Sequence, residues 1–407
     1  QLQGSRGMKV YREMTDDPVV GAILFAIEML VRQVPWRFMP SNQTPAGLEA
    51  AELVDGMLFR DMSQSWSMLL SEILSFLPYG FSFHEIVLKR RLGLEPPLDY
   101  KRNDPVWGWW APSQFNDGLL AWRKFPIRAQ DTLLRWEFDT AGGVQAMVQQ
   151  DMYRGRTATI SIEKALLFRG TSHKGNPEGR SAIRSAFSSW YMKKHLERIE
   201  GIGIERDLAG LPVAYAPVEL FGPSLDTNQQ AQMTALKNIV TNIRQDEQAG
   251  LVFPLAYDPN GHERYKIELL STGGAAKYDV DRVIRRYDTR IAQVVMADVI
   301  MLGHNVVGTQ GLASEKDEVF ALAITGFLDA IVEVFNRYAI ERLWMLNALP
   351  RETMPALMHG KIRKVDFEKF TAGVLRLSQA GLDLTQDVDH IRMEIGFPEQ
   401  VADELEL

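Results

Sequence analysis

Three arginines, Arg282, Arg286 and Arg290, recur at intervals of four residues and would form a row of positive charge along one face of a helix. Stacked like charges repel one another unless they meet carboxylates or phosphates. The rest of this segment is strongly apolar, so we expect the helix to pack on two sides. The row has three interpretations: a solvated face, a set of ion pairs between subunits, or the lining of a charged channel.

The two carboxylates of the same helix are placed to serve a different arginine. Asp281 lies four residues before Arg285 and Asp288 three residues after it, and both spacings suit a pair on one helix face. The row at 282, 286 and 290 has no such relief within its own helix. Any partner of the row should therefore lie outside the helix, and a solvated face without a partner stays open.

A second cluster combines aromatic and basic side chains on one predicted helix, which ends before Gly210-Leu-Pro. A contact with nucleic acid, a contact with another subunit and an ordinary core helix all fit this composition. The bases could pair with Glu197, with Glu200 or with carboxylates of a neighbouring chain. The members of the cluster are Trp190, Tyr191, Lys193, Lys194 and Arg198.

Patterns typical of enzymes, metals and cofactors are missing from the sequence. It has no cysteine, and none of its seven histidines is spaced like a zinc ligand pair. It contains neither a P-loop nor a nucleophile elbow. The stretch His173–Arg180, HKGNPEGR, feeds a helix N-terminus and could hold an anion, but we favour a turn between strand and helix. We expect no cofactor, no metal and no catalysis, with an enzyme of unrecognised site left as an alternative.

The charge balance argues against a tight grip on DNA. The chain has 407 residues and a net charge of −7, with a pI of about 5.6. Proteins that hold DNA over a large surface are usually basic, because neutralised phosphates supply the affinity. Any DNA contact should therefore be local or weak. The apolar stretch that begins at Pro18 is too short and too charged for a bilayer span, and the N-terminus has no signal-peptide pattern.

Hydrophobic periodicity predicts an α+β fold. Residues 1–79 should be helical, with Asp17 capping a helix that starts at Pro18 and with one long helix from Gly47 to Leu77. Residues 80–170 are rich in strands and include a hairpin around Ala141-Gly142-Gly143. Four tryptophans of this block could stack on bases, but we favour core packing. They are Trp107, Trp109, Trp110 and Trp122.

Three long helices follow, at about 181–208, 279–303 and 314–347, and each has an apolar stripe. Ser314 and Asp317 resemble a capping box at the start of the third. Between the first two lie the strand LPVAYAPVEL, a helix from Asn228 to about Gln245, and the strands GLVFP and RYKIELLS. The residues that we expect to pack these helices are Phe187, Trp190, Tyr191, Tyr287 and Ile291.

This order of elements resembles the portal proteins of tailed bacteriophages, especially the Mu-like branch. The hairpin followed by Gly179-Arg-Ser-Ala-Ile-Arg184 looks like the family's G-x-S-x-x-R entry into a long helix. GLPVAY (210–215), FLDAIVEVFNRYAIERL (327–343) and the tail AGLDLTQDVDHIRMEIGFPE (380–399) are similar to later parts of the family. The resemblance covers roughly residues 10–400 and rests on order and pattern.

The resemblance implies a ring of typically twelve copies at one capsid vertex, through which the genome is packaged and later ejected. The family's parts would be a wing (1–180), a first stem helix (181–208), a clip (209–278), a second stem helix (279–303), a tunnel loop (304–313), a long wing helix (314–350) and a crown or upper wing (351–407). Residues implied at the DNA channel or between subunits in the stem are Arg282, Arg286, Arg290, Lys194 and Arg198. Tunnel-loop candidates are His304, Asn305, Thr309 and Gln310.

Partners also follow from the resemblance. It implies contacts with further copies of the chain, the packaging motor (terminase), a head–tail adaptor or neck protein, the major capsid and scaffold proteins, and double-stranded DNA, but not with a membrane. The protein would be a head–tail connector of the virion that assembles in the host cytoplasm. Another virion structural or neck protein is the first alternative, and a nucleic-acid-processing enzyme is the second.

Overall fold

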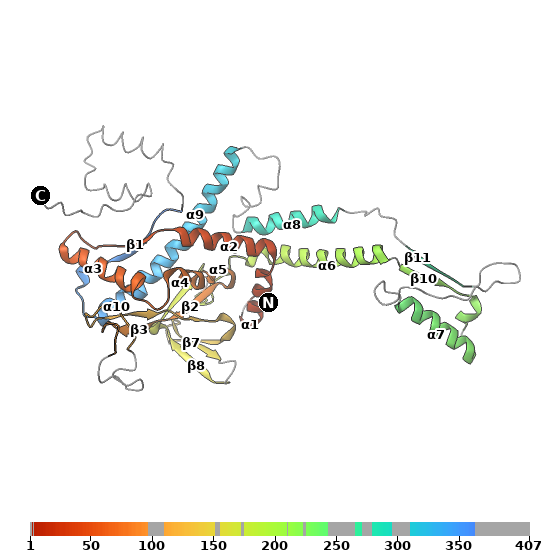
Figure 1. Cartoon of the computed structure of the whole chain (residues 1–407), viewed down its shortest axis with the longest axis horizontal. Coiled ribbons are helices and arrows are strands. Elements are labelled where there is room, and N and C mark those ends of the chain that lie inside the picture. Colours follow the sequence, from red (N-terminus) through yellow and green to blue (C-terminus); the bar gives the residue numbers. More distant parts are fainter. Residues whose placement is uncertain are drawn as a thin grey trace. The chain divides into compact units, whose positions relative to one another are not determined.

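The computed structural model describes residues 2, 4–96, 110–150, 155–171, 175–209, 211–222, 225–242, 265–270, 279–294 and 310–362. The chain divides into two units. Unit 1 comprises Gln1–Phe187 and Ile291–Leu407, and unit 2 comprises Ser188–Arg290. Both boundaries fall inside helices that the sequence predicts. Figure 1 shows the elements of each unit, which mix helices and strands.

The first part of unit 1 is helical, as expected. It contains α1 (Gly4–Thr15), α2 (Pro18–Gln33), α3 (Pro45–Asp55), α4 (Trp66–Ile73) and α5 (Phe76–Tyr79). The cap of α2 is confirmed, because Oδ1 of Asp17 accepts hydrogen bonds from the amides of Val19 and Val20 at 3.0 and 3.2 Å.

The expected single helix from Gly47 to Leu77 is wrong. After α3 the chain makes a π-turn, η1 (Gly56–Arg60), and leaves the helix at Asp61. Ser65 then caps α4 through its hydroxyl, which accepts from the amide of Met68 at 3.2 Å. The apolar period continues across the break because both helices pack on one core, so periodicity alone does not reveal the interruption.

Antiparallel strands fill the middle of unit 1. A three-stranded sheet has the order β5 (Ile127–Arg128), β2 (Phe81–Glu85), β9 (Ala165–Arg169). A second follows the chain as β6 (Leu133–Phe138), β7 (Val144–Gln150) and β8 (Thr157–Ser161). Two pairs complete the set, β3 (Val87–Arg90) with β4 (Leu120–Lys124), and β1 (Trp36–Met39) with β12 (Ala356–His359).

The strand predictions are partly confirmed. The β6–β7 hairpin turns at Ala141-Gly142-Gly143, where Gly142 has a φ of +84°. The run TATISIEKALLFRG forms two strands rather than one, because a short 3-10 turn at Ile162–Lys164 separates β8 from β9. Trp122 is buried in the core, which confirms the packing interpretation for that residue, whereas Trp107 and Trp109 lie outside the described residues.

A glycine contact joins this block to the loop before the first long helix. Gly80 and Gly179 both have positive φ, +93° and +59°. A Cβ on Gly179 would lie 2.5 Å from the carbonyl oxygen of Gly80, and a Cβ on Gly80 would lie 2.6 Å from that of Glu178. The described part of HKGNPEGR is therefore a close backbone crossing, in agreement with a turn.

A long helical rod runs through the core of unit 1. It consists of α9 (Gln310–Val334), a π-turn η7 (Phe335–Ile340) and α10 (Glu341–Leu346). The rod starts four residues before the expected Ser314, so the proposed capping box lies inside the helix and is wrong. Its segment Val319–Leu346 is long and apolar enough to cross a membrane by length and composition. One side is fully buried in the core, however, through Ile324, Leu328, Ile331 and Phe335, and this favours a core helix.

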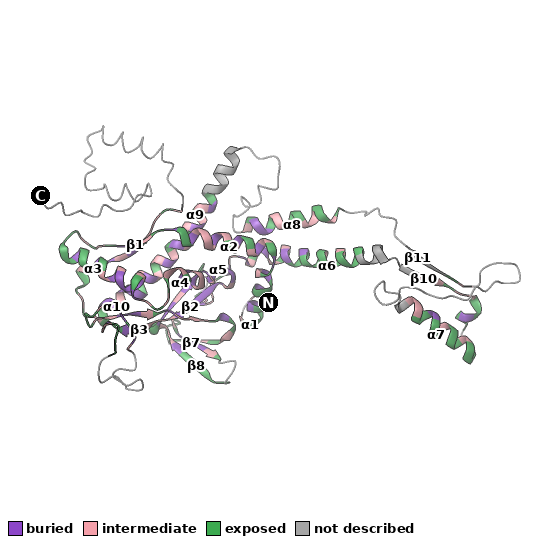
Figure 2. Cartoon of the chain, in the orientation of Figure 1, coloured by how far each residue is buried: buried purple, intermediate pink, exposed green. Residues whose placement is uncertain are grey.

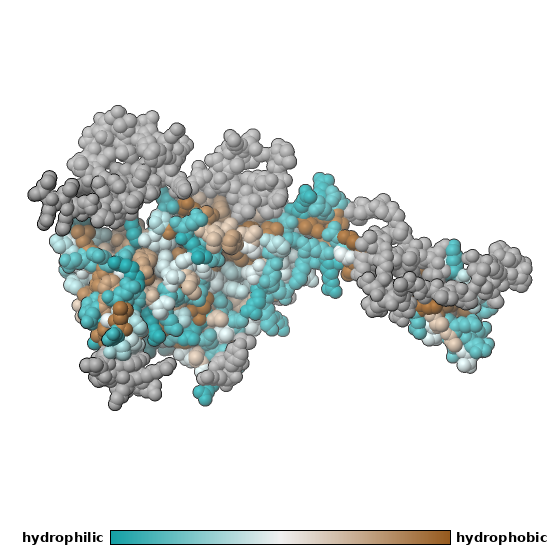
Figure 3. Space-filling model, in the orientation of Figure 1, coloured by the Kyte–Doolittle hydropathy of each residue, from teal (hydrophilic) through white to brown (hydrophobic). Residues whose placement is uncertain are grey.

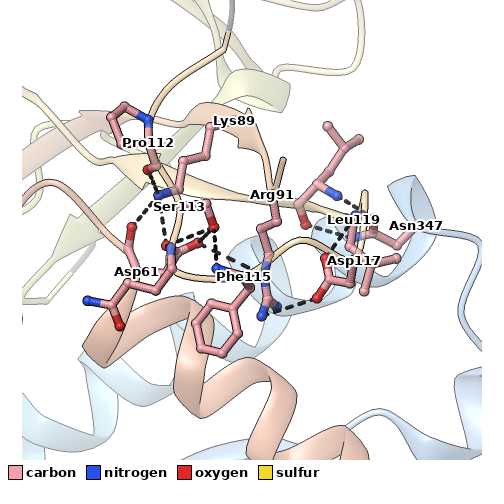
Figure 4. A network of polar contacts seen from close by, with 11 residues as sticks. Asp61, Lys89, Arg91, Pro112, Ser113, Phe115, Asp117, Leu119 and Asn347 are labelled. Carbon is pink, nitrogen blue, oxygen red and sulfur yellow. Dashed lines mark hydrogen bonds and ion pairs between the residues drawn. The ribbon is translucent and has the colours of Figure 1, made fainter. Parts of the chain in front are cut away.

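A buried network of charges holds the loop after the first π-turn (Figure 4). Nζ of Lys89 lies 3.0 Å from Oδ1 of Asp61, and the hydroxyl of Ser113 donates to the same carboxylate at 2.8 Å. Arg91 pairs with Asp117 at 3.1 Å and stacks 3.9 Å from the ring of Phe115. Charges this deeply buried persist only when they are paired, so the break at Asp61 and strand β3 fix each other's position.

The imidazole of His84 should make unit 1 sensitive to acid. It is fully buried in β2, its Nδ1 donates to the carbonyl of Phe125 at 3.0 Å, and burial lowers its pKa from 6.5 to about 4. Between pH 6.5 and about 4 the imidazole is protonated in the unfolded chain but neutral in the folded chain. The free energy of unfolding therefore decreases as the pH is lowered through that window. We expect a loss of about 2 kcal/mol between pH 7 and pH 5 from this group.

Urea unfolding of the wild type and of His84→Asn at the two pH values measures this. Asparagine retains the donor to Phe125 without a titrating ring, so its pH-dependent loss should be smaller by that amount. An equal loss in both proteins contradicts the assignment.

Candidate functional site

Two helices of unit 2 carry most of the residues singled out in the sequence. They are α6 (Phe187–Ala209) and α8 (Val280–Val294), which run antiparallel in Figure 1. Helix α6 ends at Ala209 and β10 begins at Leu211, which confirms the stop predicted at Gly210-Leu-Pro. Helix α8 is capped by Asp279, whose Oδ1 accepts from the amide of Arg282 at 3.0 Å.

A buried ion pair joins the two helices. Nζ of Lys193 lies 2.7 Å from Oδ1 of Asp288 and 3.7 Å from Oε1 of Glu197. The side chain of Lys193 is only 4% exposed and that of Asp288 16%. Arg285 pairs with Asp281 alone, at 2.8 Å, so the expectation that Asp288 also serves Arg285 is wrong. Asp288 turns to α6 because a buried ammonium needs a carboxylate more than an exposed guanidinium does.

Helix α6 has apolar side chains on two opposite faces. Trp190 is 4% exposed and lies on the same side as Lys193. Successive residues of a helix turn by about 100°, so Ile202, nine residues after Lys193, is on the other side. Tyr191, Ile199 and Ile202 there are 56%, 50% and 40% exposed. We call these three residues the bare stripe; Figure 2 shows most of the described part of α6 as exposed.

The basic residues of α6 do not share one environment. Lys193 is buried in the ion pair just described. Nζ of Lys194 lies 5.1 Å from the centre of the Trp190 ring, within the range of a cation–π contact. Arg198 is exposed. The cluster is therefore no continuous basic surface, which weakens the interpretation of α6 as a nucleic-acid helix.

The arginine row of α8 lies open. Arg282, Arg286 and Arg290 are all exposed, and none forms an ion pair with another described residue. Two of the guanidinium groups, those of Arg286 and Arg290, lie 5.5 and 5.9 Å from the ring centre of Tyr287. Tyr287 thus contacts part of the row, while the charges meet no carboxylate among the described residues.

The remaining predicted residues fall in several places. Ile291 is buried, whereas Phe187 and Tyr287 are half-buried. His304, Asn305 and Thr309 lie outside the described residues. Gln310 is the first residue of α9, so the expected loop 304–313 is wrong for its last four positions. Good helix formers such as Leu312 and Ala313 favour that earlier start.

The outer lobe of unit 2 contains a groove that sequence reasoning missed. Strand β10 (Leu211–Tyr215) pairs antiparallel with β11 (Lys266–Leu270), and α7 (Thr227–Asn242) packs on β10. A groove of about 340 Å³ lies between them. The expected strand GLVFP lies outside the described residues. The side chains that line the groove are mostly apolar and include Val213, Phe221, Met233, Leu236 and Val240.

Hydrophobic surface also follows the paired helices. Figure 3 shows brown side chains along α6 and α8 among hydrophilic ones. Nothing in the described residues of unit 2 resembles a metal cluster. The geometry therefore presents apolar stripes and a charged row, which are suited to binding rather than to bond-making chemistry.

The Lys193–Asp288 pair should stabilise the packing of α6 on α8. Lys193→Met leaves a carboxylate without its partner, and we expect a loss of about 2–3 kcal/mol, measured by chemical unfolding. The double variant Lys193→Met with Asp288→Leu should recover most of the loss, since it removes both charges. The exposed pair of Arg285 and Asp281 is the matched control, and Arg285→Met should cost less than about 1 kcal/mol. Equal losses at the two pairs would contradict a buried bridge.

Comparison with known proteins agrees with the expected family. The family model described as the portal protein of Mu bacteriophage matches residues 8–397. Among solved structures, a chain of the neck of an empty GTA particle, computed with C6 symmetry, aligns with a TM-score of 0.52 and 11% identity over 94% of this chain and 91% of that one. A chain in the virion of a native gene transfer agent particle aligns with a TM-score of 0.51 and 9% identity over the same shares.

These likenesses confirm the mixed helix and sheet fold at identities too low to show more. The family match covers nearly the whole chain and carries the function with it. Portal proteins are structural components of the phage virion that conduct the genome during packaging and ejection. The chain belongs to the family of Mu bacteriophage portal proteins.

Proposed function

We propose that this portal protein closes into a ring, with twelve copies as the expected number, and that α6 and α8 form its stem around the DNA. The bare stripe of α6 carries this proposal. Its residues are 40–56% exposed among the described residues, along a helix whose opposite side is already packed. In a ring every subunit presents one surface to the next and a different one to the previous, so a helix with two contact faces suits it.

The comparisons support the same arrangement. The similar chain of the GTA neck belongs to an assembly computed with C6 symmetry, and a ring of twelve is compatible with six-fold symmetry. In this scheme residues 1–180 form the wing, 314–350 the long wing helix and 351–407 the crown or upper wing. The segment 304–309 would carry the tunnel loop, since α9 begins at Gln310. Assembly would take place in the host cytoplasm, with the major capsid and scaffold proteins as neighbours.

The outer lobe of unit 2 is the proposed clip. Its apolar groove, together with Val218 and Phe221, which are 84% and 66% exposed, offers contact area for the packaging motor and later for a head–tail adaptor. The motor would bring its own nucleotide site, because the sequence of this chain contains no P-loop.

Charge on the bare stripe should prevent ring formation. Ile199→Glu and Ile202→Glu each place a carboxylate at a position that a neighbouring subunit would bury. Burial of the isoleucine side chain there would contribute about 2 kcal/mol to association, and the charge would lose it. We expect native mass spectrometry to show the wild type as a ring and the variants as smaller species, at least tenfold weaker in assembly. Met345→Glu, at a 66% exposed position of α10, is the control for an added charge. Rings that persist unchanged in both stripe variants would disprove the proposed stem contact.

The arginine row has two possible occupants in the ring, carboxylates of a neighbouring subunit or phosphates of the passing DNA. Reversal of all three charges to glutamate separates them. Loss of assembly at low salt identifies the neighbour, whereas intact rings that package or retain less DNA identify the channel. Arg285→Glu is the control, because that arginine has its own partner. If neither assembly nor packaging changes, the row is a solvated face and has no role in the stem.

A further inference from the structure

Polar side chains of the rod in unit 1 bind the backbone of three different sheets. The amide of Asn336 donates from Nδ2 to the carbonyl of Leu357 at 3.1 Å and accepts at Oδ1 from its N–H at 2.8 Å. Asn347 makes the same double contact with Leu120, at 2.9 and 2.8 Å. Between them, Nη1 of Arg342 donates to the carbonyl of Ala165 at 2.8 Å. The strands reached are β12, β4 and β9, each from a different sheet.

The two asparagines form hydrogen bonds with strand edges that a neighbouring strand could otherwise pair with. Leu357 lies opposite Phe38 of β1, and Leu120 lies opposite Arg90 of β3, in pairs that are two-stranded among the described residues. Along an antiparallel strand, alternate residues direct both backbone groups away from the paired strand. A carboxamide offers one acceptor and one donor side by side, as a backbone does. Each asparagine therefore closes an edge that would otherwise lie open.

Regular helix geometry would place both asparagines on one face. Eleven residues at 100° each give three turns and only about 20° more. The π-turn at Phe335–Ile340 begins one residue before Asn336 and holds an extra residue ahead of Asn347, so it changes this angle by up to about 100°. The same turn allows Phe335 and Ile340, five residues apart, both to be fully buried.

We propose that this π-turn is a register device: it rotates Asn336 away from Asn347 so that one rod anchors the β1–β12 and β3–β4 sheets on different sides and keeps unit 1 rigid. π-turns are rare and cost hydrogen-bond geometry, so one that persists in a core helix has a compensating gain. Here the gain is the closure of two sheet edges by a single helix. Asn336 and Asn347 are positioning residues on this view, and they are independent of the stem and of ring contacts.

Hydrogen exchange followed by mass spectrometry on the full chain tests this, with peptides that contain Leu357 and Leu120 as reporters. Asn336→Ala should speed exchange at Leu357 at least about tenfold and leave Leu120 unchanged, and Asn347→Ala should do the reverse. Deletion of Arg337, an exposed residue of the π-turn, should restore a regular helix and expose one reporter while the other stays protected. Arg337→Ala is the control and should change neither.

Protection of both reporters after the deletion overturns the proposal, because the turn would then not set the register. If the shortened chain does not fold, Asn336→Ala decides. A faster exchange rate confined to the Leu357 peptide supports the contact of Asn336 with β12. An unchanged rate there, or an equal increase at the Leu120 peptide, overturns the proposal.

Discussion

Helix α6 carries apolar side chains on two opposite faces, and the described residues cover only one of them well. The inner face is held by Trp190 and by the buried pair of Lys193 with Asp288, which fixes how α6 and α8 lie together. The opposite face stays largely exposed in the part of the chain that the structure describes, and burial of such apolar surface favours association. The helix pattern of unit 2 therefore supports the proposed contact between subunits. The exposed row of arginines on α8 would contribute specificity for a partner, since charge affects the choice of partner more than the affinity.

Unit 1 solves a different problem, which is to hold several small sheets in one body. Two-stranded sheets are marginal on their own. The rod supplies a shared apolar seam and polar groups that complete the strand edges, while the network around Asp61 pins the loop where the N-terminal helices change direction. Both π-turns of the described chain lie at such junctions, one just before Asp61 and one that contains Asn336. At each π-turn the irregular helix geometry accompanies a side-chain contact with a residue distant in sequence, Asp61 with Lys89 and Asn336 with Leu357.

Much of this was accessible from the sequence because it depends on short-range rules. The cap at Asp17, the hairpin at Gly142 and the end of α6 before Gly210 follow from the preferences of single residues. The family follows from the order of the elements. Two of the wrong predictions share a cause, which is that a tertiary contact overrides a local pattern. Asp288 is spaced for Arg285 but turns to Lys193, and the helix predicted through Asp61 breaks because that carboxylate is drawn into a buried network. No sequence rule used here signals a π-turn, so the asparagine contacts were out of reach.

The crossing of Gly80 with Gly179 gives the entry motif a physical meaning. Gly179 opens the pattern G-x-S-x-x-R, which looks like a local signal for the start of a helix. A side chain at Gly179 would clash with the carbonyl oxygen of Gly80, and a side chain at Gly80 would clash with that of Glu178. A larger residue at either place would push two backbones apart, and no replacement at the other could make room. The two glycines therefore constrain each other, and a substitution at one position cannot be compensated at the other.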